Sequence, residues 1–479
     1  MVRRSPWHCT AGREAGERHV PPGADRSHPG ARGSRAVTSR HDKPRLCVVL
    51  RTLGDLRRVA GFDLGCEGRQ NPTKGHPRAI QLKVTTLYLC YFGLREPLVQ
   101  MQVLPYLREL ACAGIGVRLL TFEPRQWTRD EFGRIRGQLQ ADGIAWHMLH
   151  YHKRPSWLAT AWDIAVGISM TAVLAVRHNV QILHARSHVP LLMALGARAL
   201  TRRKVVFDLR GLMAEEYADA GVWRESSLSF RAVKVVERLG LRRADEVVVL
   251  TERFRLWLLE AGLVPSGNIT VIPCCTPVPS GDGASRFPVA GRLEVVYAGS
   301  VTGLYLLEEM GRFVLALQTL RPGAFLRVLT LAPATDASER LIHAGLSSDD
   351  FWVGAAPPDN VKAYLQVASG GISFRKGTFS QIAASPTKVA EYLAAGLPVV
   401  TNAGIGDLDA LLAKDGVGVT VADFRWETLL RAARQFDDLM RTPGLVNRCR
   451  DSARRHYDLS RIGGARYRAV YARLGRQLP

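Results

Sequence analysis

Cysteine and metal-binding patterns are scarce in this chain of 479 residues. Its eight cysteines are scattered, and only Cys274 and Cys275 are neighbours. No CxxC pair or Cys/His cluster has zinc spacing, and no DxD-like metal site lies at the end of an expected strand. We therefore expect a reduced, cytoplasmic environment, no metal site and no cofactor.

Residues 1–83 lack the features of a secretory signal, because no apolar core precedes a small-residue cleavage site. They are rich in Arg, Gly, Pro, His and Ser, and we expect a disordered basic N-terminal extension. The chain also has no repeat with a period of about 20 to 50 residues, which argues against a solenoid.

Acidic residues are few, since 65 Lys and Arg face 43 Asp and Glu for a net charge of +22. The extension holds 17 of the basic and 7 of the acidic residues, so it is the most basic part. The remainder suits a protein that handles anionic substrates or lies on an anionic membrane surface. Nucleic-acid binding is an alternative, but no aromatic residues are interleaved for base stacking, so we expect no nucleic-acid partner.

Short apolar runs alternate with helical patterns from residue 84 onward, which predicts two successive α/β domains with parallel sheets. The first domain covers 84–275, a Pro/Gly-rich linker covers 276–290, and the second domain covers 291–455. A C-terminal helix over 456–479 packs back on the first domain in this interpretation. Strands are expected near 84–90, 117–122, 144–149, 180–184, 204–208, 246–250, 269–272, 293–298, 325–329, 351–353, 371–374, 397–400 and 417–421.

The stretch from Trp157 to Val176 has one charge, Asp163, and nearly the length of a membrane span. Polar side chains at Thr160, Ser169 and Thr171 interrupt it. We expect a buried or interfacial helix, with membrane association as the alternative.

The segment SPTKVAEYLAAGLPVV, residues 385–400, combines helix, strand and ligand signals. Ser385 is expected to cap a helix whose first residue is Pro386, and Gly396 is expected to end it before a buried strand. The free N–H groups at such a start favour a phosphate, and Thr387 and Lys388 lie in this first turn. Glu391 follows Lys388 by about 4.5 Å along the axis and can accept hydrogen bonds from two sugar hydroxyls. A nucleoside diphosphate fits this pattern.

Polar residues also follow the expected strands of the first domain. Because ligands bind beyond the carboxyl ends of parallel strands, these residues are candidates for an acceptor site. A carboxylate beside a guanidinium can orient a hydroxyl or assist charge separation. The residues are His184, Arg186, Ser187, His188, Asp208, Arg210, Gly211 and, one helical turn later, Glu215.

Together these segments resemble the GT-B glycosyltransferases, and within them family 4, over about residues 84–475. The matching stretches are YFGLREPLVQMQVLPYL, HARSHVP, FDLRG, RRADEVVVLTE, VIPCC, VVYAGS and TKVAEYLAAGLPVV. The resemblance implies two Rossmann-like, doubly wound domains facing across a cleft. It implies that Glu391 binds the donor ribose, that Gly299 and Ser300 lie at the donor, and that Gly93 and Arg95 lie near the acceptor.

The sequence departs from this family at two places. A first glutamate that contacts the donor sugar in many members is Ala383 here, and no Lys or Arg follows VVYAGS closely. Arg375 and Lys376 are the proposed substitutes for the missing basic pair.

The residues and the resemblance together predict a metal-independent glycosyltransferase that moves a sugar from a nucleotide sugar to a hydroxyl of a glycan, polysaccharide or glycolipid. The resemblance implies that the transfer retains the anomeric configuration. Asp208, Arg210 and Glu391 are the expected catalytic residues. A nucleotide-sugar epimerase of the same fold and a non-catalytic sugar-nucleotide sensor are the alternatives. The protein could work at the inner face of the membrane.

Overall fold

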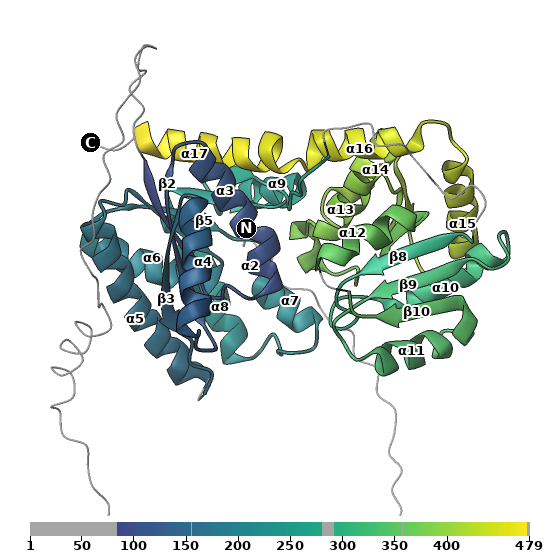
Figure 1. Ribbon diagram of the computed structural model, residues 1–479, viewed down its shortest axis with the longest axis horizontal. Coiled ribbons are helices and arrows are strands. Elements are labelled where there is room, and N and C mark those ends of the chain that lie inside the picture. Colours follow the sequence, from purple (N-terminus) through teal and green to yellow (C-terminus); the bar gives the residue numbers. More distant parts are fainter. Residues whose placement is uncertain (1–83, 155, 280–291, 357, 477–479) are drawn as a thin grey trace, which may run out of the picture. The chain divides into compact units, whose positions relative to one another are not determined.

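The computed structural model describes residues 84–154, 156–279, 292–356 and 358–476 (Figure 1). The expected extension, and the expected linker beyond residue 279, lie outside the described residues.

Seven parallel strands form the first sheet, in the order β3-β2-β1-β4-β5-β6-β7. Every strand predicted here is present. The five inner strands are short apolar runs that are largely buried, whereas the edge strands β3 and β7 are partly exposed. The strands are β1 (Thr85–Cys90), β2 (Gly116–Glu123), β3 (Ile144–His150), β4 (Ile182–Arg186), β5 (Lys204–Asp208), β6 (Glu246–Val249) and β7 (Ile269–Val271). The connecting helices are α2 (Pro97–Gln102), α3 (Leu104–Cys112), α4 (Arg129–Ala141), α5 (Ser156–Arg177), α6 (His188–Thr201), α7 (Met213–Asp219), α8 (Leu228–Arg243) and α9 (Glu252–Glu260), with η1 (Ser266–Asn268) before β7.

Six parallel strands form the second sheet, in the order β10-β9-β8-β11-β12-β13. They are β8 (Glu294–Ala298), β9 (Phe325–Leu329), β10 (Phe351–Gly354), β11 (Gly370–Ser373), β12 (Val399–Asn402) and β13 (Gly418–Val421). The helices are α10 (Leu307–Gln318), α11 (Ala334–His343), α12 (Pro358–Val367), α13 (Thr387–Ala395), α14 (Leu408–Asp415) and α15 (Trp426–Met440), with η2 (Ser348–Asp350) and η3 (Phe379–Ala383) between them. The α/β architecture expected from the sequence is confirmed.

Three helices differ from the expectation. The apolar spacing of Val99, Val103, Leu107 and Leu110 predicts one helix near 98–113. That helix is broken at Val103, because Pro105 lies in the first turn of α3 and cannot continue the hydrogen bonds of α2. The helix expected over 456–479 is divided into the π-helical turn η4 (Leu459–Gly464) and α17 (Ala465–Arg476), and a separate helix, α16 (Leu445–His456), precedes them. Helix α4 was not predicted, although the Thr128–Glu131 capping box at its start is a sequence signal for a helix.

The chain crosses between the two sheets twice, and the two crossing segments pair with each other. Thr276 and Asp458 form a parallel bridge, in which Thr276 N–H donates to the Tyr457 carbonyl at 2.9 Å. The Leu459 N–H donates to the Thr276 carbonyl at 3.0 Å. Helix α17 (Ala465–Arg476), which follows this second crossing, lies over the first domain (Figure 1).

Helix α17 contributes to the core of the first domain. Its buried side chains pack in one cluster with residues of β1, α3 and β2, among them Tyr88, Leu107 and Leu119. Tyr471 is only 1% exposed, and its hydroxyl lies 2.7 Å from His184 Nδ1. The end of the chain is therefore an integral layer of the first domain.

Both sheets change winding direction once, between β1 and β4 and between β8 and β11. In such sheets the crevice beyond the carboxyl ends of these strands is the usual ligand site. Gly299 and Ser300 follow β8, and Arg375 follows β11. The fold thus brings the expected donor residues to the switch point of the second sheet.

We predict that Tyr471→Ala destabilises the protein by about 3–5 kcal/mol, because it empties an aromatic site in the core. Chemical denaturation measured by circular dichroism would report the loss as a lower midpoint. The exposed Tyr217 provides the control, and Tyr217→Ala should lose much less. Equal losses for the two variants would show that α17 is not part of the core.

Candidate functional site

Helix α13 begins one residue later than expected. Its N-cap is Pro386, in an extended conformation, and no side chain caps the helix. The prediction that Ser385 caps it is wrong, because the Ser385 hydroxyl accepts a hydrogen bond from Cys274 N–H of the first domain at 3.2 Å. Gly396 ends the helix in the left-handed conformation, as expected, with φ of 89°.

The first turn of α13 keeps free backbone donors. Within the described part of the chain, the N–H of Val389 donates to the Pro386 carbonyl, but those of Thr387 and Lys388 have no acceptor. These groups and the positive end of the helix dipole favour an anion.

Two cations converge on Tyr305, which the sequence interpretation missed. Lys388 Nζ lies 3.4 Å and Arg375 Nη1 lies 3.1 Å from its hydroxyl. Burial opposes ionisation of this hydroxyl, but Lys388 and Arg375 outweigh burial and lower the pKa of Tyr305. The signal in the sequence is weak, because Tyr305 reaches Arg375 only through an antiparallel bridge between loops distant in the chain.

Gly299 makes room for Lys388. A Cβ at this position would lie 2.2 Å from Lys388 Cε, and the φ of Gly299 is +146°. Only glycine therefore lets the β8 loop pass beside the lysine. Ser300, next in the chain, is exposed, and its carbonyl accepts a hydrogen bond from the Tyr297 hydroxyl.

Glu391 lies one turn along α13 from Lys388, and its carboxylate has no hydrogen-bond or ion-pair partner among the described residues. Burial raises the pKa of Glu391 to about 7, which Lys388 offsets only in part. A half-buried carboxylate without a partner costs stability, so its position is better explained by a ligand than by the fold.

The other two expected donor cations are already engaged. Arg375 is 8% exposed, and its Nε donates to Gln381 Oε1 at 2.6 Å. Lys376 Nζ donates to the Asp219 carbonyl of α7 at 2.7 Å. Arg375 therefore stands beside Lys388 in one cluster, whereas Lys376 ties the second domain to the first.

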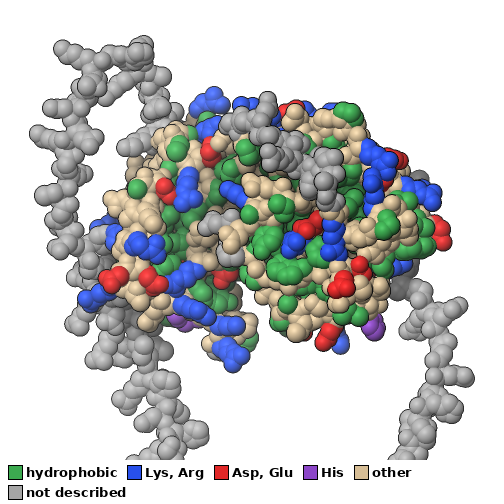
Figure 2. Space-filling model, turned by 45° about the vertical axis from the view of Figure 1, so that its right-hand side comes forward, with side chains coloured by type: hydrophobic (Ala, Val, Ile, Leu, Met, Phe, Trp, Pro, Cys, Tyr) green, Lys and Arg blue, Asp and Glu red, His purple; other side chains and the backbone are tan. Residues whose placement is uncertain are grey.

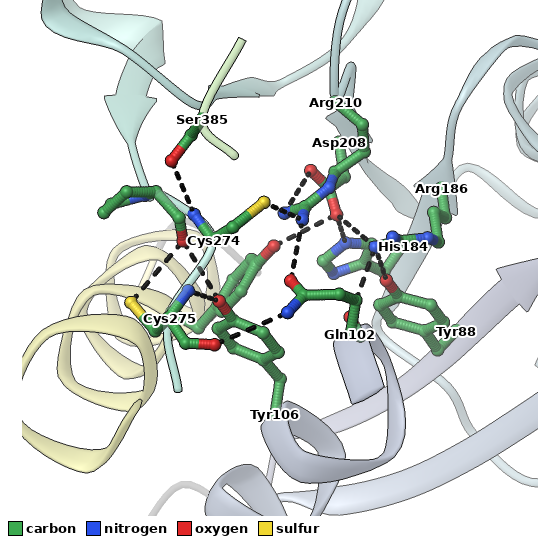
Figure 3. Close-up of polar contacts among 12 residues, drawn as sticks. Tyr88, Gln102, Tyr106, His184, Arg186, Asp208, Arg210, Cys274, Cys275 and Ser385 are labelled. Atoms are coloured by element: carbon green, nitrogen blue, oxygen red, sulfur yellow. Dashed lines mark hydrogen bonds and ion pairs between the residues drawn. The ribbon is translucent and has the colours of Figure 1, made fainter. Parts of the chain in front are cut away.

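The polar residues at the strand ends of the first domain also converge, but they are buried (Figure 3). Asp208 Oδ2 accepts from the Tyr467 hydroxyl at 3.0 Å and lies 3.5 Å from His184 Nε2 and 3.7 Å from Arg186 Nη1. Arg210 Nη1 lies 3.8 Å from Asp208 Oδ1. Burial would raise the pKa of Asp208, but Arg210, His184 and Arg186 lower it to about 2. Asp208 is therefore an ionised, fully buried group beneath α17.

Arg210 connects this cluster to the start of α13. Its Nη2 lies 3.2 Å from Cys274 Sγ, and Cys274 N–H donates to Ser385 (Figure 3). Arg210 also has a φ of +62°, which non-glycine residues seldom adopt. A strained backbone held by a buried ion pair fixes the segment that contacts the second domain.

The remaining first-domain candidates lie apart. Arg95 is exposed, pairs with Glu131 at 3.1 Å and covers the Trp127 ring at 3.6 Å, so it belongs to the α4 surface. Gly93 permits a close approach, since a Cβ there would lie 2.8 Å from Pro124. Ser187 contacts His188 Nδ1 at 3.2 Å.

Helix α7 turns its two glutamates in different directions. Glu215, the expected one, pairs with Lys234 of α8 at 2.5 Å. Glu216, which was missed, has no side-chain partner among the described residues and lies against Gly211, where a Cβ would be 2.7 Å from its Oε1. Burial raises the pKa of Glu216, and Arg375 of the second domain partly offsets this.

Ala383, at the position of the missing glutamate, is fully buried. It packs in the cluster formed by first-domain residues such as Leu209 and Leu212. The neighbouring Ile382 carbonyl accepts a hydrogen bond from Thr251 at 2.6 Å. A glutamate at 383 would place a charge in this apolar contact.

Over the described ranges, no group of three or more His, Cys, Asp or Glu residues is arranged to hold a metal ion.

Comparison with known proteins agrees with this arrangement. Residues 99–275 match the model of the glycosyl transferase 4-like domain. A glycosyltransferase from Rickettsia africae superposes with a TM-score of 0.60 at 14% identity, covering 82% of this chain and 98% of that chain. Sucrose-phosphate synthase from Thermosynechococcus elongatus gives 0.58 at 15% identity, with 81% and 100% covered. HepE from Anabaena, in complex with UDP and glucose, gives 0.58 at 13% identity, with 81% and 99% covered. A search of curated proteins found no match.

The two doubly wound sheets define the class: the fold is that of the GT-B glycosyltransferases. With its glycosyl transferase 4-like domain, the protein is a glycosyltransferase enzyme that transfers a sugar.

The raised pKa of Glu391 predicts a pH-dependent stability. The folded protein keeps this carboxyl protonated up to about pH 7 and the unfolded chain up to about 4.5, so folding stability falls as the pH rises between these values. Glu391→Gln should therefore be more stable than the wild type at pH 8, on the order of 2 kcal/mol, and equal to it at pH 4. Thermal unfolding at both pH values measures this, with the exposed Glu427→Gln as control. A difference independent of pH would contradict the assignment.

Proposed function

We propose that the protein transfers a sugar from a nucleotide-sugar donor to a hydroxyl acceptor, with retention of the anomeric configuration. The observation that carries the proposal is the unpaired carboxylate of Glu391, one helical turn from the Lys388–Tyr305–Arg375 cluster at the switch point of the second sheet. A ligand with an anionic group at one end and vicinal hydroxyls at the other satisfies both parts.

The diphosphate would bind at the start of α13. Lys388 and Arg375 supply formal positive charge, and the N–H groups of Thr387 and Lys388 supply donors aimed along the helix dipole. The same groups would stabilise the charge that develops on the diphosphate as the glycosidic bond breaks, so the step needs no resident metal. Gly299 and Ser300 would line the phosphates from the β8 loop, and Lys376 and Ser385 would hold the two domains around them.

The ribose would bind at Glu391. When it is ionised, the Glu391 carboxylate can accept hydrogen bonds from both ribose hydroxyls without competition from its own proton. HepE, similar in fold to this chain, has been solved with UDP and with UDP-glucose, which supports a nucleotide sugar as the donor.

The sugar end of the donor would meet Glu216. Helix α7 packs against η3, the segment that carries Ala383. The hydrogen bond from Lys376 Nζ to the Asp219 carbonyl, at the end of α7, holds the helix in this position. Glu216 of the first domain thus supplies a carboxylate near Ala383, the position at which the second domain lacks a glutamate. We propose that it accepts hydrogen bonds from hydroxyls of the transferred sugar.

The first domain would hold the acceptor. Gly93, the β4 end at Ser187 and the start of α7 lie beyond the carboxyl ends of its strands. Asp208, His184 and Arg186 are buried, Arg210 is only 11% exposed, and these residues would act by positioning the segment 273–275 and α17. We propose a glycan, polysaccharide or glycolipid acceptor, reached in the cytoplasm at the inner face of a membrane.

Glu391→Ala and Lys388→Ala should each weaken nucleoside diphosphate binding by about 10- to 100-fold, because each removes charge-assisted hydrogen bonds. Isothermal titration against a panel of nucleoside diphosphates measures this, beside a transfer assay. The exposed Lys414→Ala on α14 is the matched control and should bind as the wild type does. Wild-type affinity in Glu391→Ala would remove the basis of the proposal, as would a wild type that binds no nucleoside diphosphate.

Glu216→Gln should act on the sugar alone. We expect unchanged nucleoside diphosphate affinity but a loss of about 10- to 100-fold in transfer, because a charged acceptor for sugar hydroxyls is lost. Glu225→Gln, the same change on the exposed loop after α7, is the control. Transfer kinetics of Glu216→Gln within twofold of the wild type would exclude this role.

A further inference from the structure

Helix α5 exposes an apolar stripe. Between Ser156 and Val176 its one charged side chain, Asp163, is buried. Trp157 is 75% exposed and Trp162 is 55% exposed. The exposed positions recur every three or four residues, so they form one continuous side of the helix, namely Leu158, Ala161, Trp162, Ala165, Ser169, Val173 and Val176.

The same helix is anchored to the first domain on its other side. Asp163 Oδ2 accepts from the Tyr91 hydroxyl at 2.7 Å, and its Oδ1 lies 2.6 Å from His152 Nδ1. Gly167 lies so close to Met193 of α6 that a Cβ would be 2.6 Å from its sulfur. In the described chain α5 alone is long and apolar enough to cross a membrane, yet only 33% of its most apolar stretch is buried. If α5 crossed a membrane, the contacts of Asp163 with Tyr91 and His152 would be broken. If α5 lies flat on the membrane surface, these contacts are kept.

Helix α8 belongs to the same layer of helices, since α6 packs against both α5 and α8. Its outward side also carries large apolar residues: Leu228 is 83% exposed and Val235 is 63% exposed. Arginines alternate with them, at positions 231, 238, 242 and 243. Leu200, at the end of α6, is 70% exposed and lies between the two helices in chain order.

The charges on this layer have one sign. The acidic residues within α5, α6 and α8 are Asp163 and Glu237, and both are buried. The exposed ends of α5 carry Lys153, Arg154 and Arg177. On the first-domain side of Figure 2, Lys and Arg predominate over Asp and Glu along the lower left edge.

We propose that the exposed side of α5 and α8, with Leu200 of α6, rests on an anionic lipid bilayer. Indole rings favour the boundary between acyl chains and headgroups, and the flanking arginines reach lipid phosphates. A second copy of the chain fits poorly, because a two-fold contact would set these arginines against one another. The inference deepens the proposed function, since it brings the first domain to a lipid-linked acceptor, but the binding itself needs neither donor nor turnover.

The test is flotation of the full-length protein with vesicles of phosphatidylcholine, with and without phosphatidylglycerol. The wild type should float with the anionic vesicles alone, and salt should release it. Arg231→Glu/Arg242→Glu should weaken binding on the order of 25-fold, because each basic residue near an anionic surface contributes about fivefold. Trp157→Ala/Trp162→Ala should weaken it at every salt concentration.

The matched control is Arg431→Glu/Arg434→Glu on α15 of the second domain, which should float as the wild type does. The proposal fails if the tryptophan variant of α5 and the arginine variant of α8 both bind anionic vesicles as the wild type does, because basic residues elsewhere then account for the binding. Equal flotation with neutral vesicles, or a dimer in sedimentation velocity that the tryptophan variant dissociates, would also overturn it. Unchanged nucleoside diphosphate affinity in each variant separates this outcome from failure of the donor site.

Discussion

The buried carboxylate of Asp208 is the constraint on which much of the first domain depends. An ionised group in the interior is costly unless it is neutralised, and here its four partner residues come from three separate parts of the chain. His184 and Arg186 end β4, Arg210 follows β5, and Tyr467 belongs to the last helix. Removing one partner would leave this buried charge less well compensated, so the interaction favours keeping these elements together as a unit.

That unit extends to the donor helix of the other domain. Arg210 contacts Cys274, and Cys274 donates to Ser385 just before α13. Nearby, Asp407 accepts from the N–H groups of Glu252 and Arg253 at the start of α9, at 2.7 and 3.0 Å. The proposed donor site thus includes groups of both domains, and a short series of hydrogen bonds connects the start of α13 to the first domain.

The sequence was sufficient to predict the strands and their grouping, because a buried parallel strand is a short apolar run bounded by glycine, proline or a polar cluster. It also placed Lys388 and Glu391 on one face of α13, since that depends on local geometry alone. The start of the helix was missed by one residue, because the Ser385 hydroxyl serves a residue 111 positions away instead of its own helix.

The rest of the site depends on contacts that have no local signal. Glu215 and Glu216 differ by one position on α7, and only the packing of α8 decides which of them is paired. Tyr305 gains its place from a bridge to Arg375. The polar residues of the first domain lie together, as their positions at neighbouring strand ends predict. The sequence of residues 456–479 does not indicate that α17 covers this cluster through Tyr467 and Tyr471.

The position of α17 has a consequence for biosynthesis. A ribosome makes the first domain's strands early and the residues that complete its core last, after the whole second domain. Until residues 465–476 emerge, Asp208 lacks the Tyr467 hydroxyl and the apolar surface around Leu107 is uncovered. The two domains therefore cannot mature one after the other, and a chain stopped shortly before its end would expose the interior of its oldest part to chaperones and proteases.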